Sequence, residues 1–347
     1  MANKKLEANL IIDGTIQHRD GGSAGEVFTT DGGRKVLAGS SLQKNISFGE
    51  SYIDNYRDAV LDDGATFFPS DAGYEVGKLK ESGVMNNCSL LLLPSAIKAG
   101  KLYSVKPQDR TGDFTVDRNS TATYIDEDGL MKTALANVPR IDYGTGEAAL
   151  LVEPQSTNLI PYSEDFSQTL WIKSNILIES GYLAPDGTNT AYKVTVNSTG
   201  FCALYSTLNI TGITISTSFY VKSDIIGKSF SIRVGDNSIQ YTSTTEWSRF
   251  GNTFLADNNV TGFIANDIVG TVFYIWGAQF EQASTTTSYI PTNGTTVTRL
   301  ADNITVPTPA GVTSITETID GVEQTPITTI PATYSLPVGN INKVKML

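Results

Sequence analysis

The sequence contains few of the residues that build most catalytic and metal sites. Among its 347 residues are one histidine, His18, and two cysteines, Cys88 and Cys202, which lie far apart. Zinc sites and disulfide frameworks need closely spaced ligands, so neither is expected, and both cysteines are predicted to be reduced and buried. Carboxylates alone can cleave glycosides, but that chemistry needs two acids about 5–10 Å apart. Glu153 has no identifiable second acid and is expected to bond turn backbone, so we predict no enzyme and no cofactor.

Positive charge is also scarce. Charged residues make up 18% of the chain, and 25 lysines and arginines face 36 acidic residues, which gives a net charge of −11. Such a chain does not neutralise phosphates and is repelled by anionic membranes, so nucleic acid is not an expected partner. Apolar runs such as residues 90–93 are far too short to span a bilayer, and the N-terminus MANKKLEANL lacks the apolar stretch of a signal peptide. We therefore expect a protein that is made in a cytoplasm and is not inserted into a membrane.

The chain is rich in threonine, serine, asparagine and glycine, which suit strands joined by many turns. Short segments of alternating polarity, such as AYKVTV, SFSIRVG and TVFYIWGAQFE, recur at intervals of roughly 8–12 residues. This spacing predicts a mainly β chain with an antiparallel β-sandwich over residues 150–303.

The segments that flank the sandwich have different patterns. Residues 1–50 are predicted to form an extended docking arm, and residues 51–149 a mixed helical and β segment. Two short helices are predicted within residues 51–83, from apolar residues at helical spacing followed by glycine. Residues 304–347 are predicted to form a β-hairpin tail around Asp320-Gly321, and the prolines of this tail argue against a compact core.

Three tyrosines on middle strands are candidates for sugar binding. Recognition of a sugar usually needs a flat aromatic face against the apolar face of a pyranose, with polar groups to bond its hydroxyls. Tyr205, Tyr220 and Tyr241 alternate with their neighbours in predicted strands and are the proposed glycan contacts. A half-buried position in the sheet is the alternative for each.

Two polar features have structural interpretations. The acidic turn at residues 126–128 lacks the spacing of an EF-hand, so a solvated turn is expected, and a structural calcium ion stays open as the alternative. Arg299 and Asp302 are expected to pair at the rim of the sandwich, where an exposed ion pair contributes little. The loop that leaves the sandwich after residue 281 is named the exit loop, and Tyr289 and Ile290 are expected to hold it against the sandwich.

Two long segments carry recognisable motifs. Residues 118–159 contain R-x-S-x-A-T-Y, N-x-P-R-x-D-Y and L-x-E-P-Q-x-T-N-L, and residues 276–302 contain W-G-A-Q-F-E, T-S-Y-I-P-T and T-R-x-A-D. These motifs resemble segments of tailed-bacteriophage structural proteins, and the region between them is similar to the jelly-roll carbohydrate-binding modules attached to xylanases. The resemblance implies a jelly-roll fold and structural roles for the motif residues Arg118, Tyr124, Arg140, Glu153, Asn158, Trp171, Trp247, Trp276, Tyr289, Arg299 and Asp302, with the tryptophans packed in the core.

The same resemblance implies a function. A fibre-type protein of the phage particle (a tail fibre or head fibre) would use its jelly roll to bind glycan on the host surface. The alternative is a purely structural component, such as a collar, head fibre or capsid decoration, without glycan binding. The implied partners are other virion proteins, host surface polysaccharide and further copies of the chain. Isolated hairpins and open strand edges need partners, so the terminal segments are expected to pair with neighbouring copies or with the particle. The resemblance to fibre-type proteins implies a homotrimer in the virion, which docks through the arm around residues 10–16.

Overall fold

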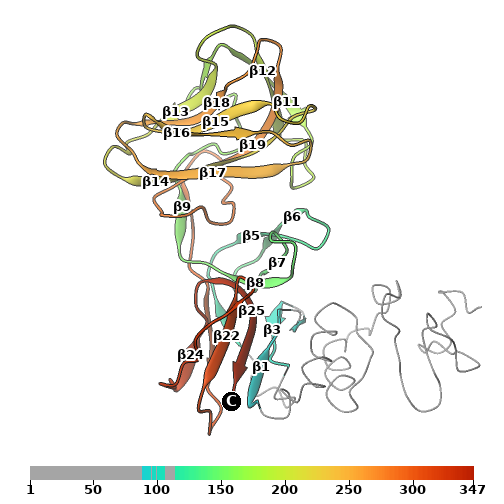
Figure 1. Ribbon diagram of the computed structural model, residues 1–347, viewed down its shortest axis with the longest axis vertical. Coiled ribbons are helices and arrows are strands. Elements are labelled where there is room, and N and C mark those ends of the chain that lie inside the picture. Colours follow the sequence, from blue (N-terminus) through green and yellow to red (C-terminus); the bar gives the residue numbers. More distant parts are fainter. Residues whose placement is uncertain (1–87, 95, 99, 106–113) are drawn as a thin grey trace, which may run out of the picture. The chain divides into compact units, whose positions relative to one another are not determined.

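The computed structural model describes residues 88–94, 96–98, 100–105 and 114–347 (Figure 1). The docking arm predicted over residues 1–50 and the helices predicted within residues 51–83 lie outside this part of the chain. The described part consists of strands joined by turns and contains no helix, and therefore no helix that could cross a membrane. The prediction of a mainly β chain is confirmed.

The described chain divides into two compact units. The first combines the described residues of Met1–Val116 with Ala148–Leu150 and Asn303–Leu347. The second combines Asp117–Glu147 with Leu151–Asp302. Each unit is therefore assembled from segments that are far apart in the sequence, while the four-part division argued from the sequence stays a prediction.

The second unit contains a sandwich of two five-stranded antiparallel sheets. Sheet A has the order β11 (Ile176–Tyr182), β12 (Ala191–Val196), β19 (Val272–Glu281), β14 (Thr214–Lys222) and β17 (Ser248–Leu255). Sheet B has the order β10 (Ile172–Ser174), β13 (Ala203–Thr207), β18 (Val260–Ala265), β15 (Ser229–Val234) and β16 (Asn237–Thr242). The chain crosses the core repeatedly, since β13, β15, β16 and β18 belong to sheet B while β14, β17 and β19 belong to sheet A, which agrees with the predicted sandwich.

The core between the sheets is built from alternate residues of each strand. In β12, Val194 and Val196 are buried, whereas Lys193 and Thr195 face outward and are partly exposed. Aromatic rings fill the centre of the core: Phe219, Phe230, Phe263, Phe273, Phe280 and Trp171. Burying one such side chain contributes roughly 1.5–3 kcal/mol, so these rings are a main source of the stability of the sandwich.

Short strands outside the two sheets complete the second unit. β5 (Ala122–Ile125) pairs with β6 (Met131–Ala134), β9 (Ser156–Asn158) pairs with β20 (Val297–Arg299), and β7 (Ile141–Asp142) follows β6 in the chain. The acidic turn joins β5 to β6. There Asp126 Oδ1 accepts hydrogen bonds from the backbone N–H groups of Asp128 and Leu130, at 3.1 and 2.9 Å, so this carboxylate closes the turn.

The first unit has an apolar core of its own, to which residues 304–347 contribute together with β1 (Leu90–Leu92), a strand from a distant part of the chain. The last strand, β25 (Gly339–Met346), pairs with β22 (Ile315–Ile319) and with β1. Val344 and Met346 are fully buried. β1 lies far earlier in the chain. A prediction made from residues 304–347 alone therefore underestimates the apolar surface that these residues bury.

The hairpin predicted at Asp320-Gly321 is present and joins β22 to β23 (Val322–Glu323). The remaining strands of this unit are short. β2 (Ile97–Lys98) pairs with β3 (Lys101–Leu102). β4 (Thr115–Asp117), β21 (Asn303–Pro307) and β24 (Thr333–Ser335) form a three-stranded sheet, and β8 (Ala149–Val152) joins the sheet of β25.

Candidate functional site

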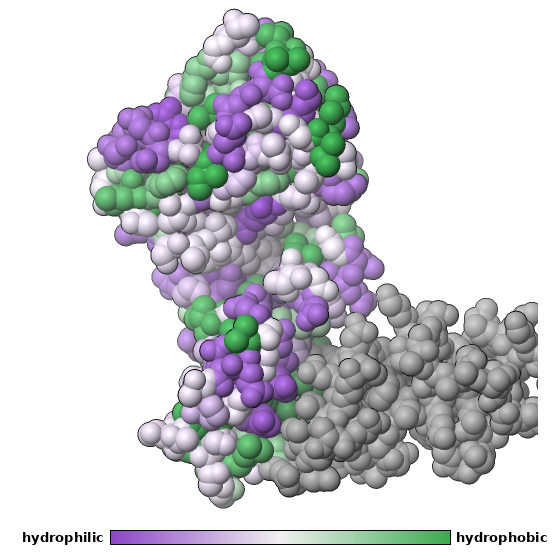
Figure 2. Space-filling model, viewed as in Figure 1, coloured by the Kyte–Doolittle hydropathy of each residue, from purple (hydrophilic) through white to green (hydrophobic). Residues whose placement is uncertain are grey.

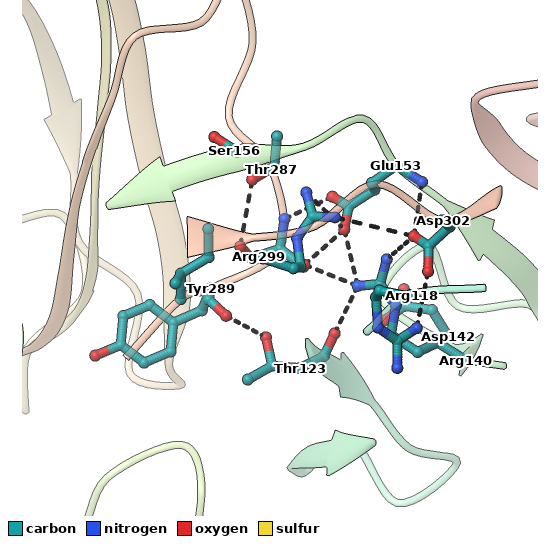
Figure 3. A network of polar contacts seen from close by, with 12 residues as sticks. Arg118, Thr123, Arg140, Asp142, Glu153, Ser156, Thr287, Tyr289, Arg299 and Asp302 are labelled. Carbon is teal, nitrogen blue, oxygen red and sulfur yellow. Dashed lines mark hydrogen bonds and ion pairs between the residues drawn. The ribbon is translucent and has the colours of Figure 1, made fainter. Parts of the chain in front are cut away.

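Five of the motif residues meet in a buried charge network, which is drawn in Figure 3. Arg118 Nη1 lies 2.8 Å from Asp302 Oδ1. Arg140 binds Asp302 through Nη2 and lies 2.8 Å from Glu153 through Nη1. Arg299 Nη2 lies 3.5 Å from Glu153. The network therefore joins the segment before the sandwich, the start of the sandwich and the segment that leaves it.

Backbone groups occupy further positions around the same side chains. Arg118 Nη2 donates hydrogen bonds to two backbone carbonyls, at 2.8 and 2.9 Å. Asp302 Oδ2 accepts a hydrogen bond from the backbone N–H of Glu153 at 2.9 Å. Glu153 in turn accepts one from the backbone N–H of Ser288 at 2.6 Å, the kind of turn contact that the sequence predicts. The charged groups are thus bound by each other and by the backbone.

The electrostatics of the network differ from the expectation of an exposed rim pair. Burial by itself raises the pKa of Glu153, but the guanidinium groups of Arg140 and Arg299 and the hydrogen bonds from Ser288 together outweigh it and hold that pKa below its ordinary value. Arg299 and Asp302 do pair, at 3.9 Å, but both side chains are buried, so the predicted rim position was wrong. The sequence did not reveal this because the closer partners of Asp302 lie far away along the chain. Buried charges of this kind are costly to separate.

Hydrogen bonds from one buried amide fix the exit loop after β19. Asn158 Nδ2 donates to the carbonyls of Ala278 and Ile290, at 3.0 and 2.8 Å, and Oδ1 accepts from the N–H of Phe280 at 3.1 Å. Tyr289 and Ile290 are buried, as expected for the anchors of this loop. Burial raises the pKa of the Tyr289 hydroxyl well above its ordinary value. The motif residues described so far therefore stabilise the fold, and their polar groups bind each other and the backbone instead of a ligand.

The remaining aromatic motif residues lie in different environments. Trp171 belongs to the core of the sandwich, and its Nε1 donates to a backbone carbonyl at 2.9 Å. Trp276 is buried on the outer side of sheet A, where its ring centroid lies 4.7 Å from that of Tyr289. Tyr124, on β5, is partly buried. Trp247, immediately before β17, is partly exposed on the outside of sheet A, so the expectation that it packs in the core was wrong.

The three predicted glycan contacts do not form one site. Tyr220 points outward from sheet A, but two aromatic rings enclose it at 5.6 and 6.3 Å, and burial raises its pKa. Tyr241 turns toward the core, and its hydroxyl donates to a backbone carbonyl at 2.6 Å. Tyr205 is partly exposed on the outer face of sheet B, beside the exposed Phe201, with ring centroids 6.1 Å apart.

A row of other side chains crosses the outer face of sheet A. It consists of residues in facing positions on neighbouring strands and ends in a tryptophan just before β17: Glu179, Lys193, Tyr274, Lys222 and Trp247. These five residues are named the outer row. Their neighbours Val194, Phe273 and Val221 belong to the core, so the outer row faces away from it.

Lys222 lies between two aromatic rings of the outer row. Its Nζ is 5.2 Å from the ring centroid of Trp247 and 5.5 Å from that of Tyr274, within the range of cation–π attraction. On the far side of Tyr274 lies the ring of Tyr182, 5.2 Å away. A β-bulge between Ser180 and Tyr182 shifts the register of β11, which lets Tyr182 share this face with Glu179.

Hydrogen bonds satisfy most polar groups of the face. Glu179 accepts from the Tyr182 hydroxyl at 2.9 Å and from Lys193 Nζ at 3.2 Å, and the hydrogen bond and negative charge of Glu179 raise the pKa of Lys193. The Tyr274 hydroxyl donates to Asp224 at 3.0 Å; burial and this bond raise the pKa of Tyr274. Lys222 is the exception, since its ammonium forms neither a hydrogen bond nor an ion pair with any residue that the structure describes.

The segment between β11 and β12 borders the outer row on one side. Trp247 Nε1 donates to the carbonyl of Leu183 at 3.2 Å, although these residues flank the two opposite edge strands of sheet A. The segment must therefore cross the face of the sheet, where it helps to cover Trp276. On the side of the second unit seen in Figure 2, apolar patches are separated by polar and neutral side chains.

Sequence reasoning did not identify five members of this face: Glu179, Tyr182, Lys193, Lys222 and Tyr274. The alternation that places Tyr220 and Trp276 outward also places Lys222 and Tyr274 outward, so extending it by two residues would have found both. Tyr182 could not be found this way, because its orientation depends on the bulge in β11.

The described residues contain no group of three or more histidine, cysteine or acidic side chains arranged to hold a metal ion. In the acidic turn, the carboxylate of Asp126 bonds the backbone and lies 3.6 Å from Lys132 Nζ. Neither Cys88 nor Cys202 forms a disulfide, and both are buried, as predicted.

Comparison with known proteins finds distant similarity to solved structures. No family model matches the chain, and no curated protein matches it. Solved structures that resemble it include the CBM22-1–GH10 modules of Clostridium thermocellum xylanase 10B, with 13% identity and a TM-score of 0.27 over 36% of this chain and 27% of that one. Another is the enzymatically active domain of bacteriophage CBA120 tailspike protein 4, with 16% identity and a TM-score of 0.27 over 35% of this chain and 21% of that one.

The CBM22-1 xylan-binding domain from Paenibacillus barcinonensis Xyn10C is similar at 8% identity and a TM-score of 0.29, over 38% of this chain and 94% of that one. The chain thus spans about a quarter or less of the first two structures and nearly all of the third. Similarity at this level does not identify a ligand, so the residues of the chain must indicate what it binds.

Proposed function

We propose that the chain is a structural protein of a bacteriophage virion, of the fibre type, and that its jelly-roll sandwich binds glycan on the host surface. The alternative is a virion component, such as a collar, head fibre or capsid decoration, that binds no glycan. The motifs of residues 118–159 and 276–302 support the virion role in both cases, because they resemble those of tailed-phage structural proteins.

One observation carries the glycan-binding part: the partly exposed rings of Tyr182, Tyr274 and Trp247 share one face with the ammonium of Lys222. Rings offer a flat apolar surface to sugar rings, and the ammonium can donate to sugar oxygens. The outer row runs over four strands to the residue just before β17, and four spacings of 4.7–4.9 Å make it about 19 Å long. That length suits an extended oligosaccharide better than a small compact ligand.

The buried charge network has a different role in this proposal. Its arginines and acids bind each other and the backbone, so the motifs that suggest a virion protein act in folding and not in ligand binding. The virion role therefore rests mainly on the residues of this buried network, and the glycan-binding role rests on the outer row, of which Trp247 alone is also a motif residue. An experiment on either role can fail without affecting the other.

Glycan binding is tested with the purified full-length chain on a glycan array and on host cells. We expect binding that falls by at least about tenfold in the double variant Trp247→Ala/Tyr274→Ala, because both stacking surfaces are removed. Tyr205→Ala is the matched control, since it removes a partly exposed ring from the outer face of sheet B. Loss of binding in Tyr205→Ala alone would move the site to sheet B. Absence of all binding would favour the structural alternative.

The remaining parts of the proposal have separate tests. Mass spectrometry of purified phage particles should detect the chain, and its absence from particles would exclude the virion role.

We propose no enzymatic activity, so incubation with host polysaccharide should release no new reducing ends. We propose a homotrimer, which light scattering of the full-length chain should show. We propose no cofactor, with structural calcium as the alternative; a chelator that lowers the melting temperature would favour calcium.

A further inference from the structure

We infer that the glycan bound by the outer row carries carboxylate groups and that Lys222 pairs with one of them; this inference rests on the proposed glycan binding. The observation behind it is the position of one ammonium group. Lys222 Nζ lies between the rings of Trp247 and Tyr274, and it has no carboxylate partner among the described residues.

A ligand that stacks on both rings must cover Lys222. The lysine faces Tyr274 directly in the register of β14 and β19. Trp247 lies on the other side of Lys222. Val221 pairs with Ser248 in the antiparallel strands β14 and β17, so one position further along the pair Lys222 lies opposite Trp247. A sugar chain that runs along the outer row therefore cannot use the two rings without removing the ammonium from water.

Covering that ammonium is unfavourable unless the ligand supplies a partner. A buried charge without a partner loses its hydration, and the faces of two rings attract a cation without neutralising it. Sugar hydroxyls can accept hydrogen bonds from the ammonium, but a carboxylate also balances its charge, and such charge-assisted bonds are the stronger kind. Among glycans of similar shape, the outer row should therefore favour acidic ones.

The other charged groups of the face already have partners, and their positions determine where the carboxylate of the ligand can bind. Lys193 lies 3.2 Å from Glu179, so this pair is neutral. Asp224 accepts the Tyr274 hydroxyl at 3.0 Å and disfavours a second carboxylate nearby. We therefore expect the ligand carboxylate on the Trp247 side of Lys222. Because the whole chain carries a net charge of −11, the attraction must act at short range within this face.

The test is affinity electrophoresis of the full-length chain in gels that contain polygalacturonate, alginate or hyaluronate, or the same polymers after chemical reduction of their carboxyl groups. Xylan and glucan are the neutral polymers. We expect retardation by at least one acidic polymer, weakened by at least about tenfold when its carboxyls are reduced. Lys222→Met should weaken it similarly, because methionine keeps an apolar stem and removes the charge, whereas Lys222→Arg should keep binding.

Lys132→Met is the matched control, since it removes the same charge from a lysine on β6 that lies beside Asp126. Equal retardation of Lys222→Met and the unchanged chain would overturn the inference. Stronger binding to a neutral polymer than to every acidic polymer, lost in Trp247→Ala, would also overturn it while leaving the proposed function intact. No retardation by any polymer, together with no binding on the glycan array, would overturn both.

Discussion

Arg118 donates a hydrogen bond of 2.8 Å to Asp302 across 184 positions of the sequence, and both side chains are buried. The two residues stand at the beginning and the end of the second unit, which runs from Asp117 to Asp302 apart from residues 148–150. Asp302 also binds Arg140 and the backbone of Glu153. This one carboxylate therefore closes the unit, and changes to it should affect stability more than binding.

Asp302→Asn should strongly destabilise the second unit. The variant keeps the shape of the side chain but removes the negative charge that balances Arg118 and Arg140, and breaking a buried pair costs about 3–5 kcal/mol. Urea unfolding followed by tryptophan fluorescence measures the change. Asp236→Asn is the control, because that residue pairs with Arg233 at an exposed position and should change stability little. Equal midpoints for the two variants would contradict a structural role for the network.

Acid should destabilise the fold partly through Glu153. Its pKa in the folded state is held below the ordinary value of 4.5, because Arg140, Arg299 and the hydrogen bonds from Ser288 together outweigh the effect of burial. The unfolded chain therefore binds the proton more tightly, and the stability that Glu153 contributes is present above about pH 4.5 and is lost as pH falls through the folded pKa. Glu153→Gln should lower stability at neutral pH and flatten its dependence on acid. Chemical denaturation at several pH values tests this, and parallel pH profiles would refute it.

Gly277→Ala should destabilise sheet A. Gly277 has a φ of +62°, and a Cβ at this position would lie 3.1 Å from the ring of Tyr220 and 3.3 Å from that of Tyr289. Backbone strain and crowding together should cost about 1–3 kcal/mol. The change is read as a lower melting temperature. Gly187→Ala is the control for backbone strain alone, because that glycine also has a positive φ but its Cβ would meet open space.

A fragment of residues 150–303, the sandwich limits predicted from the sequence, should be poorly soluble or unstable. It keeps Asp302, Glu153 and Arg299 but lacks Arg118 and Arg140, so it leaves buried acids without their closest partners. A fragment of residues 114–303 restores both arginines and should be more stable. Soluble yield and thermal unfolding of the two fragments measure the difference, and equal melting temperatures would show that the network is dispensable.

Features of the fold that depend on neighbouring residues could be predicted from the sequence, whereas features that depend on distant segments could not. Strands such as β12 and β19 were predictable because the alternation of their own residues determines which side faces the core. The hairpin of β22 and β23 was predictable because Asp320-Gly321 is a local turn signal. The core of the first unit was not predictable. Its strand β25 pairs not only with β22, which lies close to it in the sequence, but also with β1, near the other end of the described chain.

The candidate site shows the same division. Tyr205, Tyr220 and Tyr241 were chosen by alternation, which identifies the face of a strand but not what covers that face. The rings around Tyr220 come from β19 and from the exit loop, and only the folded chain brings them there. Conversely, the outer row combines residues of four strands and one loop end, none of which has an unusual local sequence.

The sequence by itself determined the β class of the described chain, the buried and reduced cysteines, the exit-loop anchors and the motif positions, because each follows from residue type and local spacing. Only the tertiary structure decided that the motif charges are buried together and that Lys222 lies between two rings. The physical reason is that strand pairing is set by distant segments and by bulges such as the one before Tyr182. A shift of one residue in register would turn a different set of side chains outward.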